Sequence, residues 1–248
     1  MKTFIISAAK GTARFFAVML LYFGAWQLIS MAVGSSLLLP SPVQTVGRML
    51  ELLSQGAVWG TIFSTLLRIV AGFFIGAAIG ILLGTVTANS RIAAWLLTPV
   101  RTIIKSAPVS SFILILLVMT ASDAIPVIIS ALMVTPILWA GTETGIKQLD
   151  PGLKEVARIY FSPAGGLLHI TVPQLSEGLF AAGATGWGLA WKAAIAAEIL
   201  AIPMNAVGSQ MYFAKLYLES VDLFAWTMII VLLSIITEQA LLLVGRKR

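Results

Sequence analysis

The sequence has 248 residues, of which 59% are hydrophobic and 10% charged, whereas about 25% are charged in a typical soluble domain. Its net charge is +6, and it has no cysteine and one histidine, His169, which excludes disulfides and thiolate sites and disfavours a histidine-based metal site. Because about 20 helical residues cross a bilayer, the chain has room for several crossings but for no large soluble domain. We expect an all-α polytopic membrane protein.

The first predicted span covers residues 15–33. Basic residues interrupt the apolar run before it, so we expect no cleaved signal peptide. Two prolines in Leu39-Pro40-Ser41-Pro42 then predict an extended turn. Apolar residues recur at helical spacing over 43–53 and alternate with polar ones, which predicts an amphipathic helix that lies on the membrane.

The second predicted span, 62–88, has a glycine at every fourth position: Gly72, Gly76, Gly80 and Gly84. This spacing makes a groove along one helix face, which another helix can approach closely. Glycine is also simply frequent in membrane helices, but the strict register favours a packing surface.

Prolines shape the next part of the chain. Pro99 and Pro108 interrupt the apolar stretch 92–118, which predicts a short interfacial helix followed by a span. Pro126 lies near the start of the following span, and Pro136 lies inside it and predicts a kink. The remaining predicted spans are 108–120, 125–146, 178–200 and 223–244, with a polar stretch, 147–169, before the last two.

The basic residues are strongly asymmetric about six crossings. Twelve fall on the side of the termini: Lys2, Lys10, Arg14, Arg91, Arg101, Lys105, Lys147, Lys154, Arg158, Arg246, Lys247 and Arg248. Two fall on the other side, Arg48 and Lys215. This bias predicts cytoplasmic termini and a cytoplasmic 147–169 stretch. Because these residues separate apolar stretches, we expect no nucleic-acid partner.

Helix start signals mark the cytoplasmic stretch. Asp150 is placed as an N-cap before Pro151, and Ser162-Pro163 repeats the pattern. Two short helices at an angle would form a projecting knob that a soluble partner could bind. An ordinary amphipathic loop helix fits the same pattern equally well.

Four passages of the chain are similar to one known family. They are Leu39 to Pro42, Thr65 to Phe73, Glu155 to Pro173 and Gly188 to Glu198. They resemble the permeases of binding-protein-dependent ABC importers, and among these the nitrate, sulfonate and taurine branch. The resemblance implies the type I ABC importer permease fold. We expect two domains: an N-terminal helix and amphipathic linker over 1–57, and the core permease domain over 58–248.

The resemblance also assigns a coupling loop at about 147–173, which docks into a cleft on the ATPase. Its matching residues are Glu155, Val156, Ala157, Arg158, Ile170 and Pro173. The family has a glycine where this chain has Phe161, and here the Ser162-Pro163 turn would replace it.

The resemblance implies a location in the bacterial inner membrane. The implied partners are two ABC ATPase subunits, an extracytoplasmic solute-binding protein and a second permease copy, which in this branch is usually identical and can be a paralogue. The chain has no G-x-x-x-x-G-K-[ST] phosphate loop, so we expect ATP and Mg in the ATPase, no cofactor on this chain and no enzymatic activity. The solute would be a sulfonate, nitrate, taurine or a vitamin precursor. A stand-alone secondary transporter and a membrane-embedded enzyme are the alternatives, although the polar residues are scattered and no inverted repeat is evident.

Ionisable residues inside spans are functional candidates by default. Lys192 and Glu198 are about 240° apart around a helix, so each needs another partner: Glu143, a second subunit, water or the substrate. In one hypothesis Lys192 lines the pathway for an anionic solute, with Trp187 and Trp191 as an apolar wall beside it. In the other, Lys192 forms a structural ion pair with Glu143 or Glu198. A further charge, Arg68, is expected to extend toward the outer interface.

Overall fold

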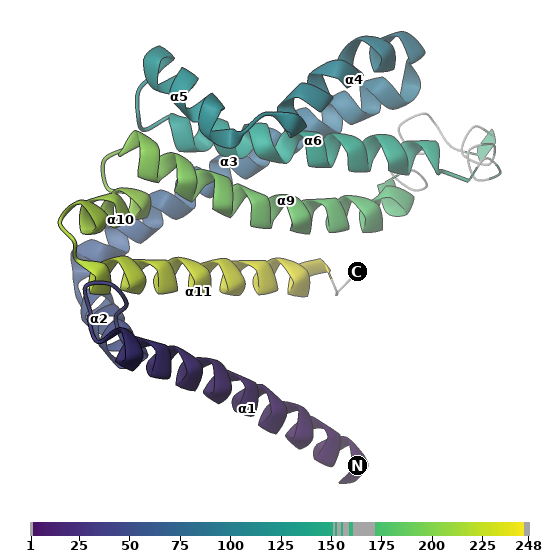
Figure 1. Ribbon diagram of the computed structural model, residues 1–248. Helices are drawn as coiled ribbons and strands as arrows, with labels where there is room; N and C mark the ends of the chain where they lie inside the picture. Colours follow the sequence, from purple (N-terminus) through teal and green to yellow (C-terminus); the bar gives the residue numbers. More distant parts are fainter. Residues whose placement is uncertain (1, 151, 153–154, 156–158, 161–171, 246–248) are drawn as a thin grey trace. The chain divides into compact units, whose positions relative to one another are not determined.

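The computed structural model describes residues 2–150, 152, 155, 159–160 and 172–245 (Figure 1). Its helices are α1 (Lys2–Val33), α2 (Pro42–Ser54), α3 (Gly56–Asn89), α4 (Arg91–Ser106), α5 (Val109–Met119), α6 (Ile125–Lys147), α9 (Val172–Ala201), α10 (Val207–Leu216) and α11 (Ser220–Gly245). None of these residues forms a strand, so the all-α prediction is confirmed over the described part of the chain.

Three of the described helices, α3, α6 and α11, are long and apolar enough to cross a membrane. The pair α4 and α5 counts as a fourth span if its two helices, bent by 98° at the break, cross together. Helices also cover the predicted first and fifth spans, as α1 and α9. The chain is therefore a multi-pass membrane protein, while its six crossings stay a prediction.

The predicted third span, 108–120, is a short helix in the structure and counts toward a crossing only together with α4. Its helix, α5, has 11 residues. At 1.5 Å per residue it is about 16 Å long, roughly half the hydrocarbon thickness. The chain breaks between α4 and α5 because Pro108 disfavours a helical Ala107, whereas Pro99 is accommodated inside α4.

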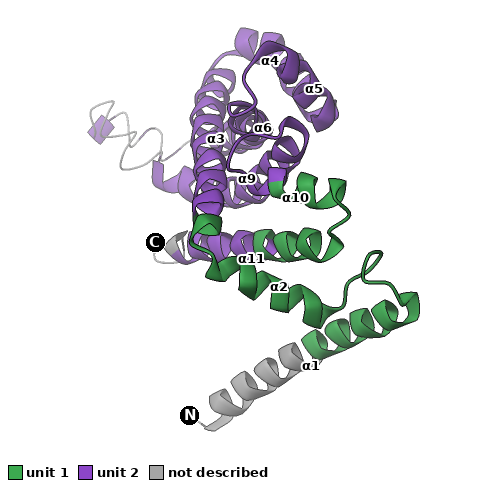
Figure 2. Ribbon diagram, turned by 90° about the vertical axis from the view of Figure 1, so that its left-hand side faces the viewer, with its two compact units in different colours: residues 1–59, 210–230 green, residues 60–209, 231–248 purple. Residues whose placement is uncertain are grey.

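The chain divides into two compact units (Figure 2). The first combines residues 1–59 with 210–230, and the second combines residues 60–209 with 231–248. Each unit joins an early segment to a late one, so neither is a single continuous stretch of sequence.

In the first unit, the turn after α1 is held by side chains of α1. The Trp26 indole N–H donates to the carbonyl of Pro40 at 3.0 Å, and the Ser30 hydroxyl donates to that of Leu39 at 2.9 Å. Ser41 then caps α2 in a reciprocal pair with Gln44. These contacts fix the direction in which α2 leaves the turn.

Arg48 of α2 ties this helix to the start of α11 within the same unit. Its guanidinium binds both carboxylate oxygens of Asp222, at 2.7 and 2.9 Å. Hydrogen bonds to Asp222 and then to Glu51 raise the pKa of Arg48 above its usual value. A planar two-bond pair of this kind fixes orientation as well as position.

In the second unit, α3 crosses α6 along the four glycines singled out in the sequence. A Cβ on Gly76 would lie 2.5 Å from the carbonyl oxygen of Ala131, and one on Gly80 would lie 2.6 Å from that of Thr135. Gly72 and Gly84 meet α6 in the same way. The glycine face therefore brings the two backbones together at a separation that no larger residue permits.

Helix α6 is the most buried helix of this unit, because α3, α5 and α9 all pack on it. Ile113 of α5, Ile129 and Met133 of α6, and Ala193 and Ala197 of α9 form a buried apolar cluster. The small residues on α9 allow the three helices to pack closely. This core positions the ionisable residues of α6 and α9.

Candidate functional site

The carboxylate of Glu198, on α9, is completely buried and receives several hydrogen bonds. The Thr65 hydroxyl and the Gly208 backbone N–H each donate to it at 3.0 Å, and Arg68 approaches it at 3.5 Å. A Cβ on Gly208 would overlap the Cβ of Glu198, so this position needs glycine. Glu198 thus joins α3, α9 and the start of α10.

Arg68 has a wider role than the expected extension to an interface. It lies in α3, and its side chain is 13% exposed. It forms an ion pair with Asp123 at 3.0 Å and donates to the carbonyl of Met204 at 2.8 Å. Nearby, Ile202 and Asn205 have φ angles of 50° and 48°, a left-handed conformation that costs energy outside glycine. Arg68 therefore fastens a strained connection between α9 and α10.

A second network surrounds Glu143, near the end of α6. Its carboxylate binds Arg101 of α4 at 2.5 Å and Lys147 at 2.6 Å. The Arg101 guanidinium also stacks over the ring of Trp139 at 5.3 Å, and the Trp139 indole N–H donates to the Thr87 hydroxyl at 2.9 Å. These contacts join α3, α4 and α6 immediately before residues 148–171.

Lys192 lies on α9 with an exposed side chain. Among the described residues it has no ion pair, since Glu198 binds Arg68 and Glu143 binds Arg101 and Lys147. The structural pair with Glu143 or Glu198 is therefore not formed in this chain. The sequence raised both carboxylates as partners for Lys192, and the structure gives each a different cation.

Trp187 and Trp191 are both buried in the second unit. The Trp187 ring packs edge-on against Phe73 at 5.2 Å between ring centres, and its indole N–H donates to Thr237 at 3.2 Å. The indole N–H of Trp191 is buried and has no acceptor among the described residues. Neither ring forms an exposed wall beside Lys192, because four-residue spacing aligns them on the buried side of α9.

The predicted coupling residues are described only in part. Glu155 is helical and exposed, and the large apolar side chains of Ile159 and Tyr160 are 73% and 76% exposed. The Asp150 carboxylate accepts from the Gly152 N–H at 2.8 Å, as the predicted N-cap requires. Pro173 is exposed in the first turn of α9. Val156, Ala157, Arg158 and Ile170, and the Phe161 to Pro163 turn, lie outside the described residues.

Sequence reasoning missed Thr65, Asp123, Gly208 and the role of Arg101. The available signal was the rule that each charge inside a span needs a partner. Arg68 is the partner of Glu198, and Arg101 is the partner of Glu143. Their partners lie 130 and 42 residues away along the chain, so no local pattern indicates them.

The chain matches the family described as "Binding-protein-dependent transport system inner membrane component" over residues 76–247. It is 28% identical over 228 residues to a probable ABC transporter permease protein of Brucella melitensis, covering 90% of this chain and 91% of that protein. It is 24% identical to a putative aliphatic sulfonates transport permease protein of Bacillus subtilis, covering 90% and 81%. A nitrate import permease protein of Synechocystis is 29% identical, over 71% of this chain and 67% of that protein.

Proposed function

The chain belongs to the binding-protein-dependent transport system inner membrane components, the permease subunits of ABC importers. From this premise we propose that it transports a small anion and that a separate ATPase drives this transport. The relatives named for aliphatic sulfonates and nitrate support an anionic solute, because both of these are anions. As a transport component of this family, the chain is a permease and not an enzyme.

One observation carries the proposal for the pathway. Lys192 is exposed on a helix of the membrane bundle and has no ion pair among the described residues. A cation facing lipid near the middle of a bilayer costs at least about 2.5 kcal/mol, so such residues face protein or water instead. A water-filled pathway that attracts an anion satisfies this requirement.

The surface around Lys192 supports pairing with a second copy. Gly178, Ala181 and Thr185 are exposed on α9 at helical spacing from Lys192. Small residues let two membrane helices approach closely. We therefore place the pathway between two identical copies, with Lys192 from each copy lining it.

The exposed side chains of Glu155, Ile159 and Tyr160 support an ATPase docking surface. Glu155 and Ile159 are both helical and exposed, so they offer a partner a carboxylate and an apolar side chain. Two ATPase subunits would hold ATP and Mg²⁺ and bind one such knob each. In this arrangement the knobs and both termini are cytoplasmic, in the inner membrane, and a binding protein delivers solute from the opposite side.

A transport assay tests the role of Lys192. We expect Lys192→Met to lower uptake of the anion at least tenfold in vesicles containing the complete transporter, and Lys192→Arg to retain most of the activity. Lys215→Met, at an exposed lysine in the last turn of α10, is the matched control and should transport normally. Unchanged uptake by Lys192→Met, in a complex that still contains its ATPase, would show that Lys192 does not line the pathway.

A further inference from the structure

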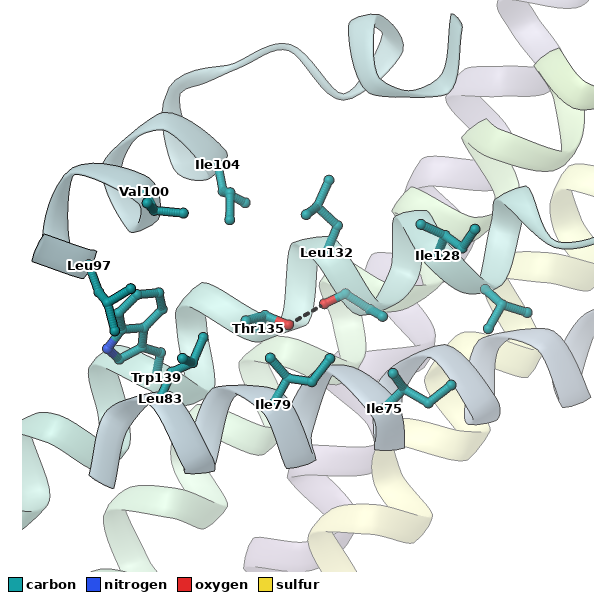
Figure 3. A pocket seen from close by; sticks show the side chains of 12 residues that line it. Ile75, Ile79, Leu83, Leu97, Val100, Ile104, Ile128, Leu132, Thr135 and Trp139 are labelled. Carbon is teal, nitrogen blue, oxygen red and sulfur yellow. Dashed lines mark hydrogen bonds between the residues drawn. The ribbon is translucent and has the colours of Figure 1, made fainter. Parts of the chain in front are cut away.

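The second unit contains an apolar cavity of about 360 Å³ between α3, α4 and α6 (Figure 3). Ile79 of α3, Val100 and Ile104 of α4, and Leu132 of α6 line it. The cavity is partly open to its surroundings, and an apolar lining of this kind disfavours water. The cavity therefore needs an apolar occupant.

The lining offers no free hydrogen-bond donor to a polar molecule inside the cavity. Its one hydroxyl, on Thr135, already donates to the carbonyl of Ala131 at 2.7 Å, the dashed line in Figure 3. The indole N–H of Trp139 is likewise occupied by Thr87. The interior of the cavity thus has the chemistry of a hydrocarbon chain.

The length of the cavity matches one leaflet of a bilayer. Along α6 its lining runs from Val127 to Trp139. Twelve residues at 1.5 Å each span about 18 Å. One leaflet contributes about 15 Å of hydrocarbon. A lipid acyl chain would therefore occupy the cavity along its length.

Positive charge lies in the second half of α4 (Arg91–Ser106), whose last turn includes Lys105. Arg101 follows the lining residue Val100, and Lys105 follows Ile104. Glu143 is shared between Arg101 and Lys147, so one carboxylate faces two cations, and Lys105 is exposed with no ion pair among the described residues. Basic clusters between membrane helices bind anionic lipid headgroups.

We propose that this cavity binds one acyl chain of an anionic phospholipid, whose phosphate contacts Arg101 and Lys105. Arg101 is bound to Glu143 through one nitrogen and its side chain is 21% exposed, which leaves other guanidinium donors for a phosphate. The bound chain fills the space under α4, a helix without a fully buried residue. The phosphate would lie in the cytoplasmic leaflet, a placement that rests on the orientation given under the proposed function.

Photo-cross-linking of the complete transporter in membranes tests this site. The probes are phosphatidylglycerol and phosphatidylcholine that carry the same photoreactive acyl chain. We expect the phosphatidylglycerol probe to label lining residues such as Val100 and Leu132 in the unaltered protein, and to exceed the phosphatidylcholine probe severalfold. Labels confined to other surfaces would overturn the proposal. An absence of labels in the cavity would also overturn it, and would indicate that a second copy of the chain fills the space.

Two neighbouring isoleucines give a matched pair of variants. Ile104→Trp fills the cavity and should lower labelling about tenfold, while Ile103→Trp, at a residue 63% exposed and outside the lining, should leave it unchanged. Lys105→Gln should bring the two probes closer to equal labelling. Equal labelling of all variants would contradict the site.

Should Ile104→Trp fail to assemble, the positions labelled in the unaltered protein still decide the question. Labelling requires neither transport nor ATPase activity. The labelling result can therefore be interpreted even if the proposed function is wrong.

Discussion

Two carboxylates anchor the ionisable residues of the second unit. Glu198 is fully buried and joins α3, α9 and the start of α10, while Glu143 joins α4 to α6 beside the predicted coupling loop. Each carboxylate binds a cation from a different helix, Arg68 or Arg101. Removing one member of such a pair leaves an uncompensated charge away from water, which costs more than the pair contributes.

The first prediction concerns Arg68. We expect Arg68→Met to destabilise the protein by about 3–5 kcal/mol, because Glu198 and Asp123 both lose their cation. Thermal unfolding of the detergent-solubilised complex measures the loss. Arg48→Met is the comparison and should cost less, since the Arg48 side chain is 34% exposed and water screens its ion pairs. Equal losses for the two variants would contradict the role of Arg68.

The second prediction compares the two cations that share Glu143. Arg101→Met removes a bond between helices and a stacking contact, whereas Lys147→Met removes a pair within one helix whose lysine is 54% exposed. We expect the larger loss for Arg101→Met, although Lys147 still pairs with Glu143 there, and about 0.5 kcal/mol or less for Lys147→Met. Unfolding midpoints of both variants check the order, and the reverse order would refute it.

At this scale the sequence identified which residues needed partners but not which partners they have. Glu143, Glu198, Lys192 and Arg68 are recognisable as charges within spans. Helical periodicity relates residues on one helix only, so it could exclude a Lys192–Glu198 pair without indicating Arg68. The pairing depends on how separate helices pack.

At the scale of elements, the packing of α3 on α6 follows from four glycines whose four-residue spacing is visible in the sequence. The helix ends could not be predicted in the same way. Helix α3 begins at Gly56 and α9 at Val172, in both cases six residues before the predicted span. Apolar composition marks the part of a helix within the membrane and not the turns beyond it. The break between α4 and α5 was predicted at its proline, but the shortness of α5 was not.

The third prediction uses two glycines of α3. We expect Gly76→Ala to destabilise the protein by about 1–3 kcal/mol, because the added Cβ would lie 2.5 Å from the carbonyl oxygen of Ala131 and 2.9 Å from its Cα. Gly60→Ala has nothing within 4 Å and should stabilise α3 by up to about 1 kcal/mol. Thermal unfolding of both variants decides, and similar midpoints would show that α3 and α6 separate easily.

At the scale of the whole molecule, hydropathy and the distribution of basic residues predict a multi-pass membrane protein, and the family match agrees with the resemblance seen in the sequence. The expected division into 1–57 and 58–248 follows the linear chain, whereas the compact units each combine distant segments. A linear sequence offers no direct sign that 210–230 groups with the N-terminal segment. The docking of an ATPase follows from resemblance and from the exposed Glu155, Ile159 and Tyr160.

The most direct test of this account is co-purification of an ATPase with the tagged chain from native membranes in mild detergent. We expect a P-loop ATPase to accompany the unaltered chain and to be lost with Glu155→Lys, because the variant reverses the charge of the exposed docking carboxylate. Glu219→Lys, at an exposed glutamate between α10 and α11, should retain the ATPase. If Glu155→Lys retained the ATPase as fully as Glu219→Lys, or if none accompanied the unaltered chain, the coupling assignment would be contradicted.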